Sequence, residues 1–481
     1  MLLPLLILIP LLSGLITFAM TPKLATVTSF IGTILTLVVA VILYNYYTAL
    51  PLTSTISYDH DWLPSLGARF SLQISSGVSL LMILLTAISF PLILANQFNK
   101  SVIKSNTFLG LILLAQSGLM GVFLSNDALL FYLFWELALI PVYFLSSMYG
   151  GEKRIAVTFK FFVYTFVGSL LMLVALLYIY SNTPAKSFDW LAFVSVANGF
   201  NIETQTWLFA CLFIAFAIKM PILPFHTWQP DAYEQSATPV TIIMSALMVK
   251  MGLFAVLRWL LPIVPDASLK YMNLVIMLSV IGIVYASCMA LVQTNIKRLI
   301  AYSSIAHVGL MCAALFSFEM LGAQGAGIQM FNHGINILGM WVIVSILENK
   351  LGTQDLRKMG GIAKLAPWFM IFLLLISLAN IALPLTNGFV GEFIMFNGLF
   401  TAHSKYAMVF TIVAGIGVIL AAVYSLRMIQ QIAYGELKSE TENFSDITWN
   451  EGLVLSIISV IIILLGVYPD LISRLLVIEK I

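Results

Sequence analysis

The chain has 481 residues, of which 61% are hydrophobic and only 9% are charged. Soluble globular proteins carry about 25% charged residues, so this composition excludes a soluble globule, a disordered chain and a secreted disulfide-rich scaffold. The formal net charge of +2 gives no electrostatic reason to expect a nucleic acid or another polyanion as partner. The composition therefore predicts an all-α polytopic protein embedded in a lipid bilayer.

Apolar runs predict how many helices span the membrane. A spanning helix with its connector takes about 30 to 35 residues, so the length allows about 14 spans, and about 14 sufficiently long runs can be placed. The first half of them lie near residues 2–20, 25–47, 76–95, 107–125, 128–148, 156–181 and 206–224. The second half lie near residues 239–262, 271–293, 299–317, 324–347, 366–400, 407–430 and 452–476.

Basic residues are distributed unevenly over the predicted loops. Loops after odd-numbered runs hold about 12 Lys and Arg side chains, Lys100 and Lys104 among them, and loops after even-numbered runs hold about 4. Because loops rich in Lys and Arg stay in the cytoplasm, we predict that the odd-numbered loops face it. Both termini of this inner-membrane (cytoplasmic-membrane) protein are then expected on the outer side.

Sequence motifs give no reason to expect a cofactor or a metal ion in this chain. It has no G-x-G-x-x-G after a strand, no Walker loop and no cysteine cluster for iron and sulfur. The three cysteines lie singly in apolar runs, without C-x-x-C spacing: Cys211, Cys288 and Cys312. Three glycines that open an apolar helix are interpreted as close-packing positions: Gly322, Gly325 and Gly327.

Lys160 and Arg258 lie near the ends of predicted membrane segments, where their charges can reach water. Six ionisable side chains lie deeper and are the candidates for a function: Glu136, Lys219, Lys250, His307, His333 and Glu392. Glu136 lies about eight residues, or roughly 12 Å, into its run, too deep to reach surface water. A charge at the bilayer centre costs about 2.5 to 3.5 kcal/mol on insertion scales, so such groups face a bundle interior. A single one is often only a polar packing contact, but a row of acids and bases predicts a proton path.

Two predicted spans are interrupted. The seventh contains Lys219-Met220-Pro221-Ile222-Leu223-Pro224, whose prolines lack backbone donors, so its helix must break or kink. The twelfth, about 35 residues long, is interrupted between Asn380 and Gly388. Paired interruptions are typical of transporter repeats, so we predict two inverted five-helix repeats with discontinuous helices 7 and 12. The predicted divisions are 1–105 for helices 1–3, 106–262 and 263–433 for the repeats, and 434–481 for a cytoplasmic loop and helix 14.

Four long motifs surround these residues. They are Phe134-Trp135-Glu136-Leu137 with Pro141; Lys219-Met220-Pro221 through Pro224, with His226, Trp228 and Pro230-Asp231-Ala232; Asn295 to Ser304 followed by His307; and Phe389-Val390-Gly391-Glu392-Phe393. Over essentially the whole chain, these motifs resemble the antiporter-like membrane subunits of proton-pumping NADH:quinone oxidoreductase, respiratory complex I. One departure is Tyr233, which stands where the family commonly has histidine, followed by a displaced Pro239.

Glu392 distinguishes the branches of that family. The L- and N-type subunits and the related sodium/proton antiporter subunits usually carry lysine at this position, so the glutamate resembles the M-type branch, which includes mitochondrial chain 4. The sequence also ends shortly after the fourteenth run, so the long lateral helix of the L-type is not expected. The resemblance therefore implies an M-type subunit.

The resemblance implies a subunit that moves protons through half-channels, driven by quinone reduction in other subunits. Glu136 and Lys219 would form the coupled ion pair, Lys250 the central relay, and His307, His333 and Glu392 the path and exit of the second half-channel. The chain would belong to a proton-translocating oxidoreductase without doing redox chemistry itself. Flavin, iron-sulfur clusters and quinone are expected in partner subunits, and the L- and N-type antiporter-like subunits are expected among the partners.

Three other functions remain compatible with these residues. A subunit of a multisubunit sodium/proton antiporter would need no redox partner, although Glu392 argues against it. A membrane subunit of a ferredoxin- or hydrogenase-linked relative of complex I would share the same motifs. A purely structural scaffold is the third alternative.

Overall fold

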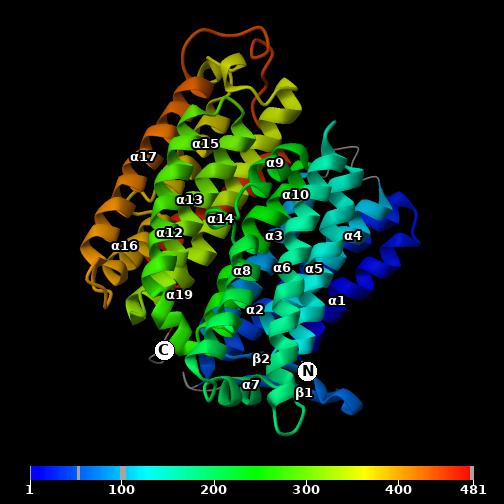
Figure 1. Ribbon diagram of the computed structural model, residues 1–481. Helices are drawn as coiled ribbons and strands as arrows, with labels where there is room; N and C mark the ends of the chain where they lie inside the picture. Colours follow the sequence, from blue (N-terminus) through cyan, green and yellow to red (C-terminus); the bar gives the residue numbers. More distant parts are fainter. Residues whose placement is uncertain (1, 51–54, 98–104, 477–481) are drawn as a thin grey trace. The chain divides into compact units, whose positions relative to one another are not determined.

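The computed structural model describes residues 2–50, 55–97 and 105–476, and helices dominate all three ranges (Figure 1). The chain divides into two compact units. The first unit consists of Met1–Met220, Leu247–Met272 and Leu475–Ile481, and the second of Pro221–Ala246 and Asn273–Arg474. Each unit is therefore assembled from separate stretches of the chain.

The first unit is built on long helices. They are α1 (Leu2–Phe18), α2 (Pro22–Ala49), α3 (Gly77–Asn96), α4 (Asn106–Leu124), α5 (Ala128–Met148), α6 (Arg154–Asn182), α7 (Trp190–Ala197), α8 (Ile202–Lys219) and α11 (Val249–Ala255), with the π-helix η4 (Val256–Leu260) and the 3-10 turn η1 (Pro64–Leu66). The strands β1 (Ile56–Leu63) and β2 (Ala68–Ile74) complete it.

The second unit is also helical. It contains α9 (Trp228–Gln235), α10 (Thr238–Ile242), α13 (Ile296–Leu315), α14 (Met320–Leu351), α15 (Pro367–Asn380), α16 (Asn387–Phe400), α17 (Ala407–Ala433), α18 (Trp449–Val467) and α19 (Asp470–Ser473), with the 3-10 turns η5 (Leu356–Lys358) and η6 (Ile362–Lys364). The π-helix η3 (Ile243–Met248) and α12 (Pro265–Val292) each run from one unit into the other.

Twelve helices within the described ranges are long and apolar enough to cross a membrane, and α1 and α15 are shorter apolar helices. This confirms the predicted all-α polytopic membrane fold, because the predicted spans coincide with these helices. The count of about 14, the inverted repeats and the four divisions of the chain stay predictions. Lys100 and Lys104, which contributed to the predicted orientation, lie outside the described residues.

Both predicted interruptions are present. Helix α8 ends at Lys219, before the two prolines, and the next helix begins at Trp228. Helix α15 ends at Asn380 and α16 begins at Asn387, so Glu392 lies in the second turn after the gap. Prolines, which both interrupted segments contain, therefore predicted correctly where the backbone leaves the helix.

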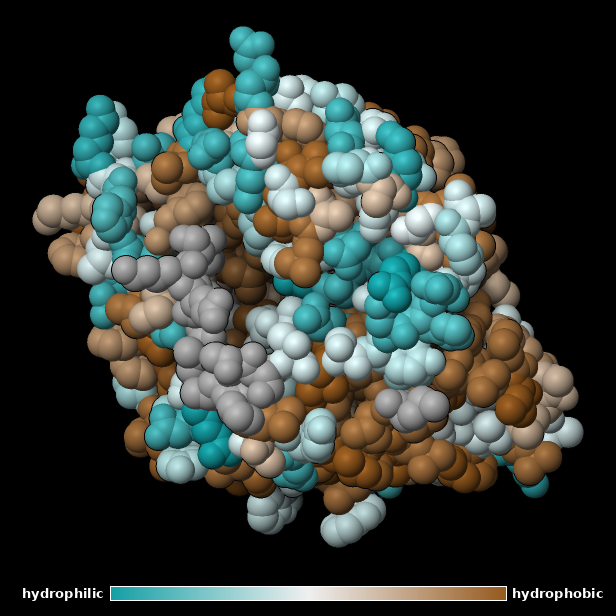
Figure 2. All heavy atoms as spheres, turned by 90° about the horizontal axis from the view of Figure 1, so that it is seen from below, coloured by the Kyte–Doolittle hydropathy of each residue, from teal (hydrophilic) through white to brown (hydrophobic). Residues whose placement is uncertain are grey.

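A β-hairpin follows α2 and was not predicted. Strands β1 and β2 pair antiparallel, with His60 opposite Phe70, and Arg69 forms an ion pair of 2.7 Å with Asp59. The end of the molecule that carries this hairpin and α7 is seen from below in Figure 2, where hydrophilic side chains gather in clusters and hydrophobic ones dominate much of the margin. A polar end face bordered by apolar side chains fits a protein whose loops reach water and whose helices do not.

Candidate functional site

Glu136 is placed by a firmly capped helix. The Asp127 side chain accepts hydrogen bonds of 3.0 Å from the backbone N–H groups of Leu129 and Leu130, which fixes the start of α5. Burial raises the pKa of the Asp127 carboxyl, although its hydrogen bonds from backbone N–H groups act in the opposite direction. Glu136 lies in the third turn, half-buried, and its Oε1 atom is buried without a hydrogen-bond partner. An unsatisfied carboxylate oxygen at this depth is poised to bind a proton or a water.

Lys219 is the last residue of α8 and is 2% exposed. Its Nζ atom lies 5.3 Å from the centroid of the Trp135 ring and has no hydrogen-bond partner. The carbonyl end of a helix favours a cation, and so does the face of an indole ring. The charge of Glu136 also acts on Lys219, but the two side chains form no ion pair within 4.0 Å. The predicted partners are therefore brought together without direct contact.

Lys250 lies on α11 and is fully buried. Two π-helical segments, η3 and η4, flank this short helix. Such insertions are rare and occur often at functional sites. A Cβ atom added at Gly252 would come within 2.9 Å of the backbone of α8 at Phe216 and Met220, so α11 packs directly against the helix end that carries Lys219. The two lysines thus lie on helices in close contact.

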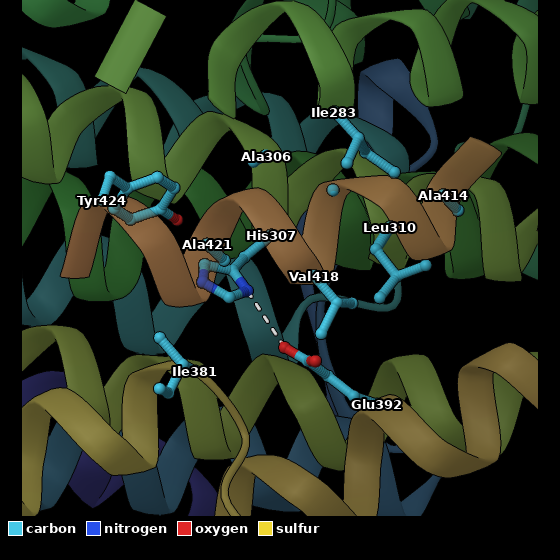
Figure 3. A pocket seen from close by; sticks show the side chains of 11 residues that line it. Ile283, Ala306, His307, Leu310, Ile381, Glu392, Ala414, Val418, Ala421 and Tyr424 are labelled. Atoms are coloured by element: carbon cyan, nitrogen blue, oxygen red, sulfur yellow. Dashed lines mark hydrogen bonds and ion pairs between the residues drawn. The ribbon is translucent and has the colours of Figure 1, made fainter. Parts of the chain in front are cut away.

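The second unit joins His307 and Glu392, which are 85 residues apart in sequence. His307 Nδ1 on α13 lies 3.1 Å from Glu392 Oε1 on α16, and both side chains are buried (Figure 3). The ring of His333 on α14 lies 5.4 Å from the ring of His307, centroid to centroid. The structure therefore brings together the three residues predicted for the second half of the path.

Close packing of α14 against α16 places Glu392. A Cβ atom at Gly325 would lie 2.7 Å from the Met395 nitrogen, and one at Gly391 would lie 2.3 Å from the Gln329 side chain. Close backbone approach therefore requires glycine on both helices, as predicted for Gly322 and Gly325. This face of α14 is therefore a packing surface, as its glycines predicted.

Asparagines of α14 satisfy the backbone opened by the gap between α15 and α16. Asn336 Nδ2 donates to the Ala379 carbonyl over 3.1 Å, and Asn332 Nδ2 donates to the Asn387 carbonyl over 2.7 Å. The Ala379 carbonyl lies in the last turn of α15, where carbonyls lack intrahelical partners, and it also accepts from the Ala382 N–H over 3.2 Å. These two residues were not singled out from the sequence, although uncharged amides within an apolar run are a usable signal.

A small cavity adjoins the His307–Glu392 pair. Its volume is about 20 Å³, and His307, Glu392 and Tyr424 line it together with apolar side chains (Figure 3). The Tyr424 hydroxyl, from α17, donates to Ser303 Oγ over 2.8 Å. Tyr424 was not singled out from the sequence, because it carries no charge itself and lies among apolar residues.

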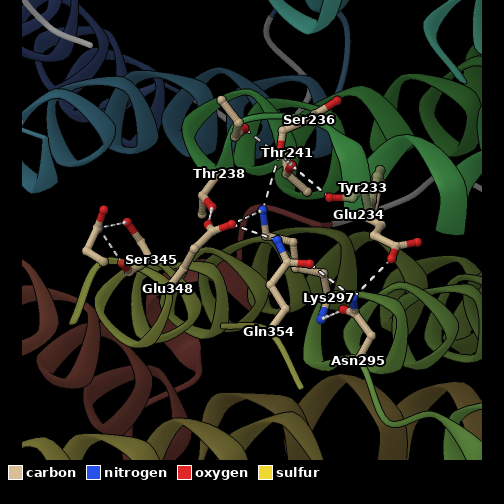
Figure 4. Close-up of polar contacts among 12 residues, drawn as sticks. Tyr233, Glu234, Ser236, Thr238, Thr241, Asn295, Lys297, Ser345, Glu348 and Gln354 are labelled. Carbon is tan, nitrogen blue, oxygen red and sulfur yellow. Dashed lines mark hydrogen bonds and ion pairs between the residues drawn. The ribbon is translucent and has the colours of Figure 1, made fainter. Parts of the chain in front are cut away.

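A polar network joins three loops of the second unit (Figure 4). Lys297, which is 2% exposed, forms an ion pair of 2.9 Å with Glu348, and the other carboxylate oxygen of Glu348 accepts from Thr238 over 2.7 Å. One guanidinium nitrogen of Arg298 contacts Asp231 and Glu234, each at 2.9 Å. The motif that begins at Asn295 therefore anchors the segment after the α8 interruption to α13 and α14. All three loops follow odd-numbered predicted runs, and the predicted topology places them on one side.

These arrangements suit proton transfer better than other chemistry. Lys219 and Glu392 lie beside helix interruptions, and Lys250 lies between two π-helical segments. Glu136, His307 and His333 lie within continuous helices, and buried polar atoms without partners are available to water. Among the residues described, no group of three or more His, Cys, Asp or Glu side chains is placed to hold a metal ion.

Comparisons with known proteins point in the same direction. Residues 125–419 match a model of the family described as NADH:quinone oxidoreductase/Mrp antiporter, transmembrane. The sequence is 38% identical over 414 residues to NADH-quinone oxidoreductase subunit M of Rickettsia prowazekii (strain Madrid E). The aligned residues cover 85% of this chain and 82% of that protein.

Two solved structures share the fold. Respiratory complex I from Thermus thermophilus with bound NADH contains a chain that is 27% identical and matches with a TM-score of 0.90, over 99% of this chain and 97% of that one. A chain of the Mrp complex from a Dietzia species is 18% identical and matches with a TM-score of 0.88, over 98% and 95%. At that identity the second likeness shows the fold alone.

Proposed function

This chain belongs to the NADH:quinone oxidoreductase/Mrp antiporter transmembrane family, and within it to the subunit M proteins, and we propose that it translocates protons as a subunit of NADH:quinone oxidoreductase. The observation that carries the proposal is the buried pair of His307 and Glu392 beside an interrupted helix. A carboxylic acid in contact with an imidazole can take up, share and release a proton at membrane depth. Lys219, Lys250 and Glu136 supply the corresponding groups in the first unit.

Membership of this family supports the remaining parts of the proposal. The chain does no redox chemistry itself, and partner subunits hold the flavin, the iron-sulfur clusters and the quinone. Its neighbours in the complex include the L- and N-type antiporter-like subunits. The complex lies in the inner membrane, with both termini of this chain on the outer side, as the Lys and Arg bias of the loops supports. Membership of the subunit M proteins favours this assignment over an antiporter subunit without a redox partner.

The test uses the assembled complex in inside-out membrane vesicles, with NADH oxidation and proton uptake measured together. Glu392→Gln keeps the shape of the side chain but cannot carry a transferable proton, so we expect proton uptake to fall by about 100-fold or more per NADH oxidised. Glu203→Gln, at an exposed position in the first turn of α8, is the matched control. Full proton uptake in the Glu392→Gln complex would contradict the proposal.

A further inference from the structure

His307 has a second ring nitrogen whose partner is not another residue. Nδ1 contacts Glu392, whereas Nε2 is buried and has no hydrogen-bond partner within the described part of the chain. A buried imidazole nitrogen without a partner is energetically costly unless water satisfies it. A position for one water beside this nitrogen would remove that cost.

The cavity next to the pair supplies the space. Its volume of about 20 Å³ is room for one water molecule, because a water needs about 10 to 15 Å³ of such space. His307, Glu392 and Tyr424 are the polar side chains among its lining residues, and the remainder are aliphatic or glycine. In Figure 3 the Tyr424 and Glu392 side chains approach the His307 ring from different sides. A water there would have these three polar side chains around it, and a buried water typically makes two to four hydrogen bonds.

Hydrogen bonds through Ser303 fix the orientation of the Tyr424 hydroxyl. Its hydroxyl proton is committed to Ser303 Oγ over 2.8 Å, and Ser303 also accepts from Asn380 Nδ2 over 3.3 Å. The phenol oxygen therefore presents its lone pairs, and not its proton, to the surroundings. Ser303 lies one helical turn before His307 on α13, so both ends of this arrangement rest on the same helix.

We propose that Tyr424 is a positioning residue for proton transfer: with Ser303 it holds one water in this cavity against His307 Nε2. The water donates one hydrogen bond to the Tyr424 oxygen and exchanges a proton with His307. When a proton leaves the pair, the N–H bond at Nε2 breaks and an O–H bond forms at the water, while another O–H bond of this water breaks and its proton passes to a neighbouring water of the path. The imidazolium becomes neutral and the bound water is regenerated. Tyr424 keeps its own proton throughout. This inference rests on the proposed function.

Tyr424→Phe tests the inference because it removes only the hydroxyl. We expect proton uptake per NADH oxidised to fall by about two- to tenfold, which corresponds to the loss of one hydrogen bond. The rate of electron transfer, measured separately in detergent, should not change. Tyr47→Phe, at a buried tyrosine of α2, is the matched control. Ser303→Ala should reproduce the loss of proton uptake, whereas Ser303→Thr should keep normal uptake because it keeps the hydroxyl. The double variant Tyr424→Phe/Ser303→Ala should lose no more uptake than either single variant.

A second variant tests the water independently of Tyr424. Ala421→Val fills the cavity from α17 and should lower proton uptake as Tyr424→Phe does, whereas Ala433→Val, at a buried position of the same helix outside the cavity, should not. A map of the assembled complex that resolves waters should show one at this position, and an empty cavity would overturn the inference.

The outcomes separate this inference from the proposed function. Normal uptake in Tyr424→Phe alongside lost uptake in Glu392→Gln would overturn only the role of Tyr424, whereas normal uptake in both would overturn the proposed function. Failure of the Tyr424→Phe complex to assemble would also overturn the positioning role, because it would show that the hydroxyl serves the fold.

Discussion

The two units hold their ionisable residues in different ways. In the first unit, Lys219 and Glu136 attract each other without contact, and the Lys219 ammonium faces the Trp135 ring. In the second unit, His307 touches Glu392, and asparagines close the helix gap beside them. The helices of a pair without contact can move, and so change the attraction between its charges, without breaking a hydrogen bond, whereas a pair in contact can share a proton directly. The first unit is thus suited to sensing a displacement and the second to binding a proton.

The largest expected effect follows from replacing Lys219 by Met, which keeps the length and removes the charge. Proton uptake per NADH should fall by about 100-fold, because the group that controls Glu136 is lost. The free energy of unfolding should be unchanged or higher by about 1 to 3 kcal/mol, because a buried charge without a contacting partner is removed. Vesicle uptake assays and thermal unfolding of the purified complex measure the two quantities.

Lys270→Met, at an exposed lysine of α12, is the control for that substitution. A lower melting temperature in Lys219→Met than in this control would show that Glu136 and Lys219 form a stabilising contact. The distinction between the units would then be lost.

The second unit should behave in the opposite way when one partner is removed. His307→Ala leaves the Glu392 carboxylate buried and unpaired, so the free energy of unfolding should fall by about 3 kcal/mol. The double variant His307→Ala/Glu392→Gln should recover at least about 1 kcal/mol of that loss, since residues in contact are energetically coupled. Denaturant unfolding of the four complexes in a double-mutant cycle measures the coupling. Strictly additive losses would argue against a direct interaction.

The sequence predicted the helices and their interruptions better than the contacts between them. Uninterrupted hydrophobicity identifies spans, and Pro221, Pro224 and the proline-containing stretch between Asn380 and Gly388 identify the gaps, because these signals are local. The π-helical segments around Lys250 could not be predicted, since their residues are as apolar as those of an ordinary helix. The β1–β2 hairpin was not predicted, although Ala68 to Ile74 alternate between apolar and polar residues as a strand does, because so few residues form no apolar run.

The candidate sites show the same limit. All six ionisable residues were identified, because a charge in an apolar run is visible without a structure. The contact of His307 with Glu392 spans 85 residues and depends on glycines that let α14 and α16 approach. Tyr424 has a hydroxyl that matters only through its position beside the cavity, and nothing local distinguishes it from a tyrosine that faces lipid.

A smaller effect is expected at the asparagine that closes the gap of the second unit. Asn336→Leu removes the side-chain donor of the Ala379 carbonyl, which still accepts from the Ala382 N–H over 3.2 Å, so the free energy of unfolding should fall by about 0.5 to 1.5 kcal/mol. Asn182→Leu, at an exposed end of α6, should change it by less than about 0.5 kcal/mol. Thermal unfolding of the purified complexes compares the two. Equal melting temperatures would mean that the backbone donor alone satisfies the carbonyl.

The smallest expected effect concerns backbone strain, which also separates the two interruptions. In the gap between α15 and α16, Ala382 and Leu385 have φ values of +56° and +72°, whereas no residue of 220–227, all of them described, has a positive φ. The left-handed conformation costs a residue with a side chain about 1 to 2 kcal/mol. Ala382→Gly removes that cost but loosens the unfolded chain, so we expect a gain of at most about 1 kcal/mol in the free energy of unfolding.

The control for this strain lies within a regular helix. Ala422→Gly in α17 should destabilise the protein by about 1 kcal/mol, because glycine is a poor helix former. If Ala382→Gly raises the melting temperature and lowers proton uptake, the strain serves the movement of α16, and with it Glu392. If it raises the melting temperature with uptake unchanged, the gap is fixed by its asparagines alone. A lower melting temperature than that of the unsubstituted complex would show that Ala382 is not strained, and the two interruptions would then differ only in their hydrogen bonds.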